Sequence, residues 1–129
     1  MPAPANDAGE PPEIEGRTFN FALRIVRVCL VLDKIAGVRR TLGNQLLRSG
    51  TSIGANVTEA QAAQSKPDFI SKMNIALKEA RETLYWLRLV GASELLAEGQ
   101  LSAITQEAHE IARILGAIVR SARRNRECS

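Results

Sequence analysis

Apolar side chains recur at helical spacing along most of the chain. From about Thr18 to Ile35, steps of four and three residues separate Phe21, Ile25 and Val28. This spacing places the apolar side chains on one face of a helix, as in the seam of a helical bundle. The stretch is also more apolar than one core face requires, which indicates a second contact surface.

The same period continues in three later segments, with no convincing strand between them. We expect these helices to run from about Val38 to Ala63, from Ser65 to Val90 and from Ser102 to Ala122. Four helices joined mostly by short connections predict an all-α, antiparallel up-down-up-down four-helix bundle. The bundle domain is expected over residues 17–125, with disordered residues 1–16 before it and 126–129 after it.

The helical period also predicts which side chains form the core. We expect the core to contain Ile25, Val28, Leu32, Leu46, Ile53, Leu77, Leu84, Ile111, Leu115 and Ile118.

Local signals set several expected helix ends. Ser65, Pro67 and Asp68 form a helix start, with serine as the N-cap and an acid three residues later. Gly91 is expected to end that helix, and one short helical turn is expected over Glu94–Ala97. Residues 49–56 favour a loop by propensity, but the apolar period continues through them in phase, so we predict helix there. Their small side chains are expected to serve a subunit interface.

Charge is unevenly distributed along the chain. Residues 1–16 hold four of the five prolines and four acids with no Lys or Arg, which is typical of a disordered tail. The whole chain carries +3, so the rest of the chain carries a net charge of +7. Such a basic body attracts polyanions, although the same excess also keeps ordinary proteins soluble.

The arginines are the main candidates for binding a polyanion. Arg17, Arg24 and Arg27 fall within an arc of about 100° on the first helix. In the predicted topology that helix begins at the end of the bundle where the last helix finishes. The predicted nucleic-acid site is therefore Arg17, Arg24, Arg27, Arg120, Arg123 and Arg124. The alternative is that these side chains form internal ion pairs or complement helix dipoles.

Few residues could carry catalysis or bind metal. His109 is the single histidine, and the two cysteines are Cys29, expected in the core, and Cys128, expected in the tail. We therefore expect no enzymatic activity, metal, cofactor or small-molecule substrate. No secretion signal or membrane span is apparent, so a cytoplasmic location is expected. Trp86 and its neighbour Tyr85 are expected to fill the core or an interface.

Four polar residues of the second helix share one face because their spacing is four, four and three. They are Arg48, Ser52, Asn56 and Glu59. They could form a recognition site or, as the favoured interpretation, a hydrogen-bonded layer that fixes helix register or a subunit contact. Glu79 and Glu82 of the third helix are candidates to pair with Arg48.

The run LRSGTSIGANVTEA over residues 47–60 is similar to a family pattern, R-x-x-x-S-I-x-x-N-I-x-E, with Val57 in place of isoleucine. The run IALKEARETLYWL over residues 75–87 is similar to the third helix of the same family. The chain therefore resembles, over about residues 18–124, a bacterial four-helix bundle family that includes proteins encoded in intervening sequences of 23S ribosomal RNA genes. It is also similar to the accessory variability proteins of diversity-generating retroelements. The resemblance implies homopentamer assembly and no enzymatic activity, and the second group implies nucleic-acid binding.

Two functions remain open from the sequence. One is a non-enzymatic homo-oligomer that binds RNA or DNA through basic patches. The other is an oligomeric scaffold for a protein partner, with no role in nucleic-acid binding. The two differ in whether the arginines of the predicted site form one exposed patch or are used in internal ion pairs.

Overall fold

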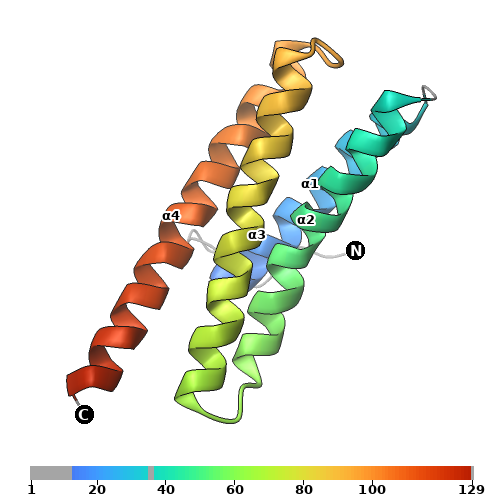
Figure 1. Cartoon of the computed structure of the whole chain (residues 1–129). Helices are drawn as coiled ribbons and strands as arrows, with labels where there is room; N and C mark the ends of the chain where they lie inside the picture. The colour runs from blue at the N-terminus through green and yellow to red at the C-terminus, as the bar shows by residue number, and fades with distance from the viewer. Residues whose placement is uncertain (1–12, 35–36, 129) are drawn as a thin grey trace, which may run out of the picture.

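Four helices make up the chain in the computed structural model, which describes residues 13–34 and 37–128. They are α1 (Ile14–Asp33), α2 (Val38–Gln61), α3 (Lys66–Ala92) and α4 (Glu98–Cys128). The described residues include no strand, so the predicted all-α fold with four helices is confirmed. The helices lie side by side, with α2 joined to α3 at the bottom of the view and α3 joined to α4 at the top (Figure 1). Packing is closest between α1 and α2 and between α2 and α3, and weakest between α1 and α4.

The first helix differs from its predicted bounds. It begins at Ile14 and ends at Asp33, so residues 14–16 belong to the helix and not to the predicted tail. The predicted tail over residues 1–12 and the predicted helix end at Ile35 lie outside the described residues. Ile14 packs against the core, and this burial explains the earlier start.

The connection between α3 and α4 also differs from its prediction. Gly91 lies inside α3, which continues to Ala92, and residues 94–97 form a turn and bend without a helical turn. Packing holds this last turn of α3, because Val90 is fully buried and Gly91 faces Leu101 of α4. A left-handed backbone occurs after the helix at Glu94, with φ 58°.

The start of α3 agrees with the sequence. The Ser65 side chain accepts a hydrogen bond from the Asp68 backbone N–H at 3.1 Å, and Pro67 lies in the first turn. The fourth helix is longer than expected at both ends, since it begins at Glu98 and continues past 125 to Cys128.

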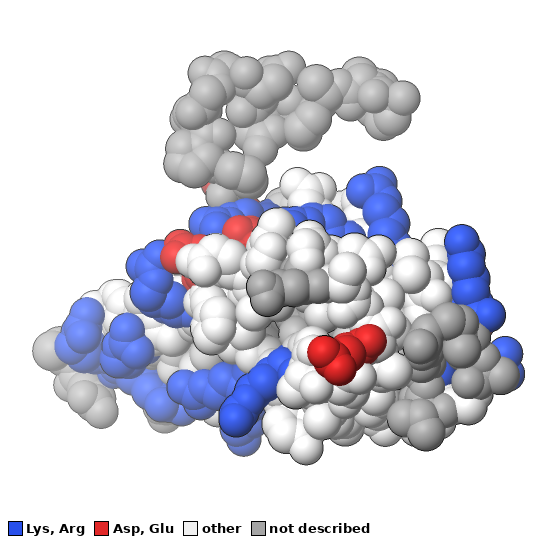
Figure 2. Space-filling model, turned by 90° about the horizontal axis from the view of Figure 1, so that it is seen from above, with Lys and Arg blue, Asp and Glu red and all other residues white. Residues whose placement is uncertain are grey.

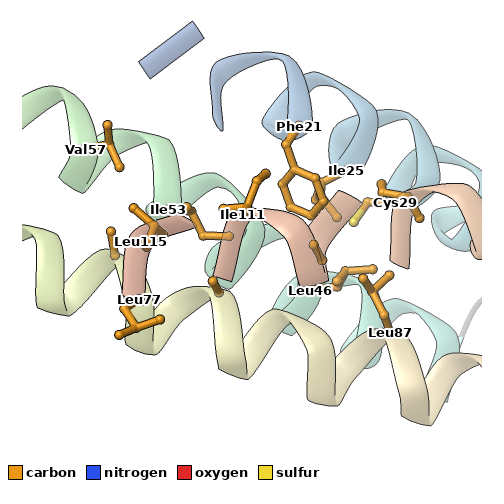
Figure 3. Packing of buried hydrophobic residues seen from close by; sticks show 14 of the residues in the cluster. Phe21, Ile25, Cys29, Leu46, Ile53, Val57, Leu77, Leu87, Ile111 and Leu115 are labelled. Carbon is orange, nitrogen blue, oxygen red and sulfur yellow. The ribbon is translucent and has the colours of Figure 1, made fainter. Parts of the chain in front are cut away.

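The core runs between all four helices, where apolar side chains converge (Figure 3). Seven of the ten predicted core residues are buried. The predictions for Val28, Leu84 and Ile118 are wrong in degree: these side chains pack against the core but stay partly exposed. In α1 and α4 the neighbouring residues, Cys29 and Val119, take the buried positions.

Small residues of α2 let α1 approach closely. A Cβ at Gly50 would lie 2.8 Å from the Cγ1 and Cγ2 atoms of Ile25, and a Cβ at Gly54 would lie 3.3 Å from the Thr18 backbone. Because α2 runs without a break through residues 49–56, the helical prediction for them is confirmed. The expected role of this face is wrong at Gly50 and Gly54, because both face α1 of the same chain and not another subunit.

Among the described residues, no helix has the length and apolar character needed to cross a membrane.

Candidate nucleic-acid interface

Arg17 does not belong to an exposed basic patch. Its Nε and Nη2 donate to the Glu107 carboxylate of α4 at 2.8 Å each, and the two side chains are only 25% and 22% exposed. The bidentate hydrogen bond holds the pKa of Glu107 below its ordinary 4.5 and raises the pKa of Arg17. Arg17 thus joins α1 to α4 in an internal ion pair, the alternative that the sequence left open for the arginines of the predicted site.

The other arginines of the predicted site do not lie together on one surface. Arg24 is half-buried and lies close enough to Glu107 for its positive charge to lower the pKa of that carboxyl. Arg120 stands about 20 Å further along α4 than Glu107, at a rise of 1.5 Å per residue, and Arg123 and Arg124 lie further still. The expected single patch over the ends of α1 and α4 is therefore wrong. α1 meets α4 near Glu107, not near the arginines at its end.

Arg27 is exposed on α1, and Arg123 and Arg124 are exposed on α4. Within the described chain none of these three forms an ion pair. Arg27 lies on α1, which makes only a small contact with α4.

A different basic surface lies over α3 and α4. One hollow between these helices is lined by Arg88 and His109, and a second is lined by Lys66, Arg113 and Arg120. On α3, three exposed basic residues at spacings of three and seven share one face with helical periodicity. We define the α3–α4 basic face as Lys66, Lys78, Arg81, Arg88, Arg113, Arg120 and Arg124.

Figure 2 shows the molecule from above, so its left side is the left side of Figure 1, where α4 lies. Its lower edge is the front of Figure 1, where α3 lies. A run of Lys and Arg follows this lower left side, with no Asp or Glu between them (Figure 2). The spacing of Lys78, Arg81 and Arg88 in the sequence indicates this face. The positions of the helix ends do not.

Acidic side chains near this face are used in contacts within the chain. Glu79 accepts from Arg48 at 3.3 Å, and Glu82 pairs with the same guanidinium. Glu110 pairs with Arg113 within α4. The other six residues of the face form no ion pair within the described part of the chain: Lys66, Lys78, Arg81, Arg88, Arg120 and Arg124. The face therefore presents a positive potential with few local counter-charges.

The polar residues of α2 make contacts inside the bundle. The Ser52 hydroxyl donates to the Arg48 carbonyl at 2.6 Å, and the Asn56 amide donates to the Ser52 carbonyl at 2.9 Å. Glu59 pairs with Lys72 of α3 at 3.1 Å. Arg48 joins the two helices through the glutamates of α3, which was one of its expected pairings. These contacts favour a structural role over a recognition site.

A buried hydroxyl pair reinforces the same α2–α3 contact. The Thr83 hydroxyl donates to the Ser49 hydroxyl at 3.0 Å, and both residues are fully buried. Among the described residues, every buried side-chain nitrogen and oxygen has a hydrogen-bond partner.

The two neighbouring aromatic residues of α3 differ in environment. Trp86 is half-buried, and its Nε1–H donates to Glu82 Oε2 at 3.0 Å, which lowers the pKa of Glu82. Tyr85 is 56% exposed, so it does not lie in the core, and the other expected place, an interface, stays a prediction. Its ring meets Trp86 edge-on, with ring centroids 5.0 Å apart and planes at 75°.

Metal binding has no support in the described part of the chain, where no group of three or more His, Cys, Asp and Glu side chains could hold an ion. Cys29 is buried, and its thiol donates to the Gly43 carbonyl at 3.3 Å. The Cys128 side chain lies outside the described residues.

Comparison with known proteins settles the family. A family model described as 23S rRNA-intervening sequence protein matches residues 13–117. The chain belongs to this family. The match contains Lys78, Arg81 and Arg88 and ends before the last arginines of α4.

A solved structure supports both the family and the fold. It is the crystal structure of a protein of unknown function from the S23 ribosomal protein family of Bacteroides thetaiotaomicron VPI-5482, which is 44% identical in sequence. The similarity covers 83% of this chain and 98% of that one, with a TM-score of 0.75. No curated protein matches the chain.

Proposed function

We propose that this protein is a non-enzymatic, antiparallel four-helix bundle that assembles with copies of itself and binds the backbone of a nucleic acid. The observation that carries the proposal is the α3–α4 basic face, where six of the seven Lys and Arg side chains lack ion pairs within the described chain. Phosphates are the ligands that such a surface of exposed guanidinium and ammonium groups recognises best.

The chemistry of this face favours contact with the backbone. Exposed Lys and Arg side chains on two helices can each contact a phosphate, and phosphate contacts carry no sequence information. Binding is therefore expected to depend steeply on salt and weakly on sequence.

Assembly is supported by an apolar surface on the other side of the bundle. Phe19, Leu23, Val26 and Leu30 follow one another on the outer face of α1, and Leu47 of α2 lines a shallow hollow with two of them. We define these five residues as the α1 apolar face. Contiguous exposed apolar side chains mark interaction sites, and a second copy of this chain is the occupant that the family resemblance implies, in a pentamer.

Fluorescence anisotropy with labelled RNA and duplex DNA tests the binding proposal. The double variant Arg81→Ala/Arg88→Ala should bind about tenfold or more weakly than the wild type at low salt, because two phosphate contacts are lost. The matched control is Lys34→Ala/Arg40→Ala, which removes the same charge near the α1–α2 connection and should change affinity by less than about threefold. Circular dichroism confirms that both variants remain helical.

Two outcomes would contradict the proposal. Equal losses in the two variants would mean that only net charge matters. No binding of the wild type to RNA or DNA at low salt would leave the scaffold function, for which the α1 apolar face supplies a docking surface for protein.

A further inference from the structure

An exposed aromatic ring lies in the middle of the α3–α4 basic face. Tyr85 follows Arg81 by four residues and precedes Arg88 by three, so all three side chains project from the same side of α3. The ring is 56% exposed, and within the described residues no hydrogen bond involves its hydroxyl group. More than half of the ring surface is therefore open to a ligand.

A chain of contacts holds this ring in place. Tyr85 meets the ring of Trp86 edge-on, and the Trp86 indole N–H donates to Glu82 at 3.0 Å. Glu82 in turn pairs with Arg48 of α2. Because the hydrogen bond to Glu82 holds the Trp86 ring, Tyr85 packs against a fixed neighbour and loses little rotamer freedom when a ligand covers it.

We infer that Tyr85 is a stacking platform for a base of single-stranded nucleic acid, held there by phosphate contacts to Lys78, Arg81 and Arg88. This inference rests on the proposed nucleic-acid function and specifies its ligand class. A single strand can splay a base onto an exposed ring, whereas paired bases in a duplex keep their faces inside the stack. The positive charges one helical turn away on either side hold the backbone next to that base.

The test compares two nucleic acids and three proteins. The probes are labelled oligouridine of about 20 nucleotides and an RNA duplex of the same length, longer than the site sizes of known single-strand binders. The proteins are the wild type, Tyr85→Ala and Tyr85→Phe, each measured by fluorescence anisotropy at the same salt concentration. Thermal unfolding by circular dichroism confirms that the exposed substitution leaves the fold intact.

The wild type should bind oligouridine more tightly than the duplex. Tyr85→Ala should weaken binding of oligouridine by about 5- to 150-fold, the range found when stacked aromatic residues are replaced by alanine. It should leave duplex affinity within about twofold, since no base stacks there. Tyr85→Phe should retain the wild-type affinity for both, because stacking needs the ring and not the hydroxyl.

Other outcomes overturn the inference in distinguishable ways. If Tyr85→Ala binds oligouridine like the wild type while Arg81→Ala/Arg88→Ala loses affinity, backbone binding stands and the stacking role is wrong. The same conclusion follows if Tyr85→Ala weakens both probes equally, or if the wild type prefers the duplex. If the wild type binds neither probe at low salt, both the inference and the proposed function fail.

Discussion

At the scale of single residues, the ion pair of Arg17 with Glu107 affects which arginines are left to form a basic surface. The pair joins α1 to α4, which make the smallest contact of the four neighbouring helix pairs. Bidentate arginine–carboxylate pairs have fixed geometry, and this one is mostly shielded from water. It therefore removes an arginine from the surface and specifies where α1 lies against α4.

The Glu107 carboxyl should make stability fall in mild acid. Its pKa in the folded protein is below the ordinary value of 4.5 because Arg17 hydrogen-bonds to the charged form. Its contribution is thus complete above about pH 5 and is lost as the pH falls through 4.5 and below. Glu107→Gln should flatten the decline of the free energy of unfolding between about pH 5 and pH 3, measured by urea titration.

The matched control for this prediction is Glu110→Gln. It removes an ion pair within α4 that does not connect two helices, and such pairs contribute little to stability. The control should keep the wild-type decline, and an unchanged decline in Glu107→Gln would show that the pair contributes nothing to acid stability.

The Cys29 thiol should be unreactive while the protein is folded. Burial, with a smaller effect of Asp33, raises its pKa to about 11, and the residue is only 8% exposed. At pH 8 about one thiol in a thousand is then ionised. In the variant Cys128→Ser, Ellman's reagent should label Cys29 only after unfolding in guanidinium. Rapid labelling of the folded variant would place this thiol outside the core.

At the scale of elements, the close contact of α1 with α2 depends on glycines that helix propensity disfavours. Gly50 and Gly54 each weaken α2 by about 1 kcal/mol in isolation. The segment is helical because it packs closely on α1. Glycine suits these two positions, since a Cβ would press on Ile25 or on the Thr18 backbone. Tertiary packing thus outweighs local propensity in this segment.

Gly50→Ala should destabilise the fold although alanine is the better helix former. Its Cβ would lie 2.8 Å from two carbons of the fully buried Ile25. We expect a loss of about 1–3 kcal/mol from overpacking, partly offset by propensity. Gly99→Ala is the control, since nothing lies within 4 Å of the added Cβ and stability should stay equal or rise. Urea unfolding measures both, and a Gly50→Ala variant at least as stable as the wild type would contradict the close contact.

The sequence predicts these elements well because the helical period depends only on which side of each helix is buried. Four helices and seven of ten core residues follow from that period. It does not give the exact edge of the buried face, so Val28 is only partly buried beside Cys29, which lies in the core as expected. Nor does it give the ends that packing extends, as at Ala92 in α3.

The candidate site was less predictable for a related reason. Sequence spacing gives the direction in which Arg17 and Arg24 project from α1. It does not give their level along α4, that is, which residues of α4 they lie beside. That level depends on where α1 begins and which carboxylate it meets, here Glu107. The stripe on α3 was accessible from sequence because Lys78, Arg81 and Arg88 lie on one helix, where spacing alone determines the face.

At the scale of the whole molecule, the two surfaces divide the proposed tasks. The α1 apolar face is the candidate for contact between copies, and the α3–α4 basic face is the candidate for nucleic acid. Because they lie on different helices, several copies could pack through one surface and leave the other accessible. Charge repeated in an assembly would strengthen the attraction for a long polyanion.

Assembly should depend on the α1 apolar face. Light scattering on the wild type at micromolar concentration should give a mass several times that of one chain, with five copies expected from the family resemblance. Leu30→Glu places a charge on a side chain that is 60% exposed and should shift the protein towards single chains. Ile75→Glu, at a similarly apolar exposed site on α3, should keep the wild-type mass. A wild type with the mass of one chain would exclude the assembly.

The salt dependence of nucleic-acid binding tests the central claim most directly. For the wild type, the logarithm of the association constant for oligouridine should fall linearly with the logarithm of salt concentration, by about 0.7 for each phosphate contact. Replacing Arg120, Arg123 and Arg124 together by alanine should weaken binding and reduce the magnitude of that slope by up to about 2. A slope near zero for the wild type, or the same slope in the triple variant, would contradict binding through these cations.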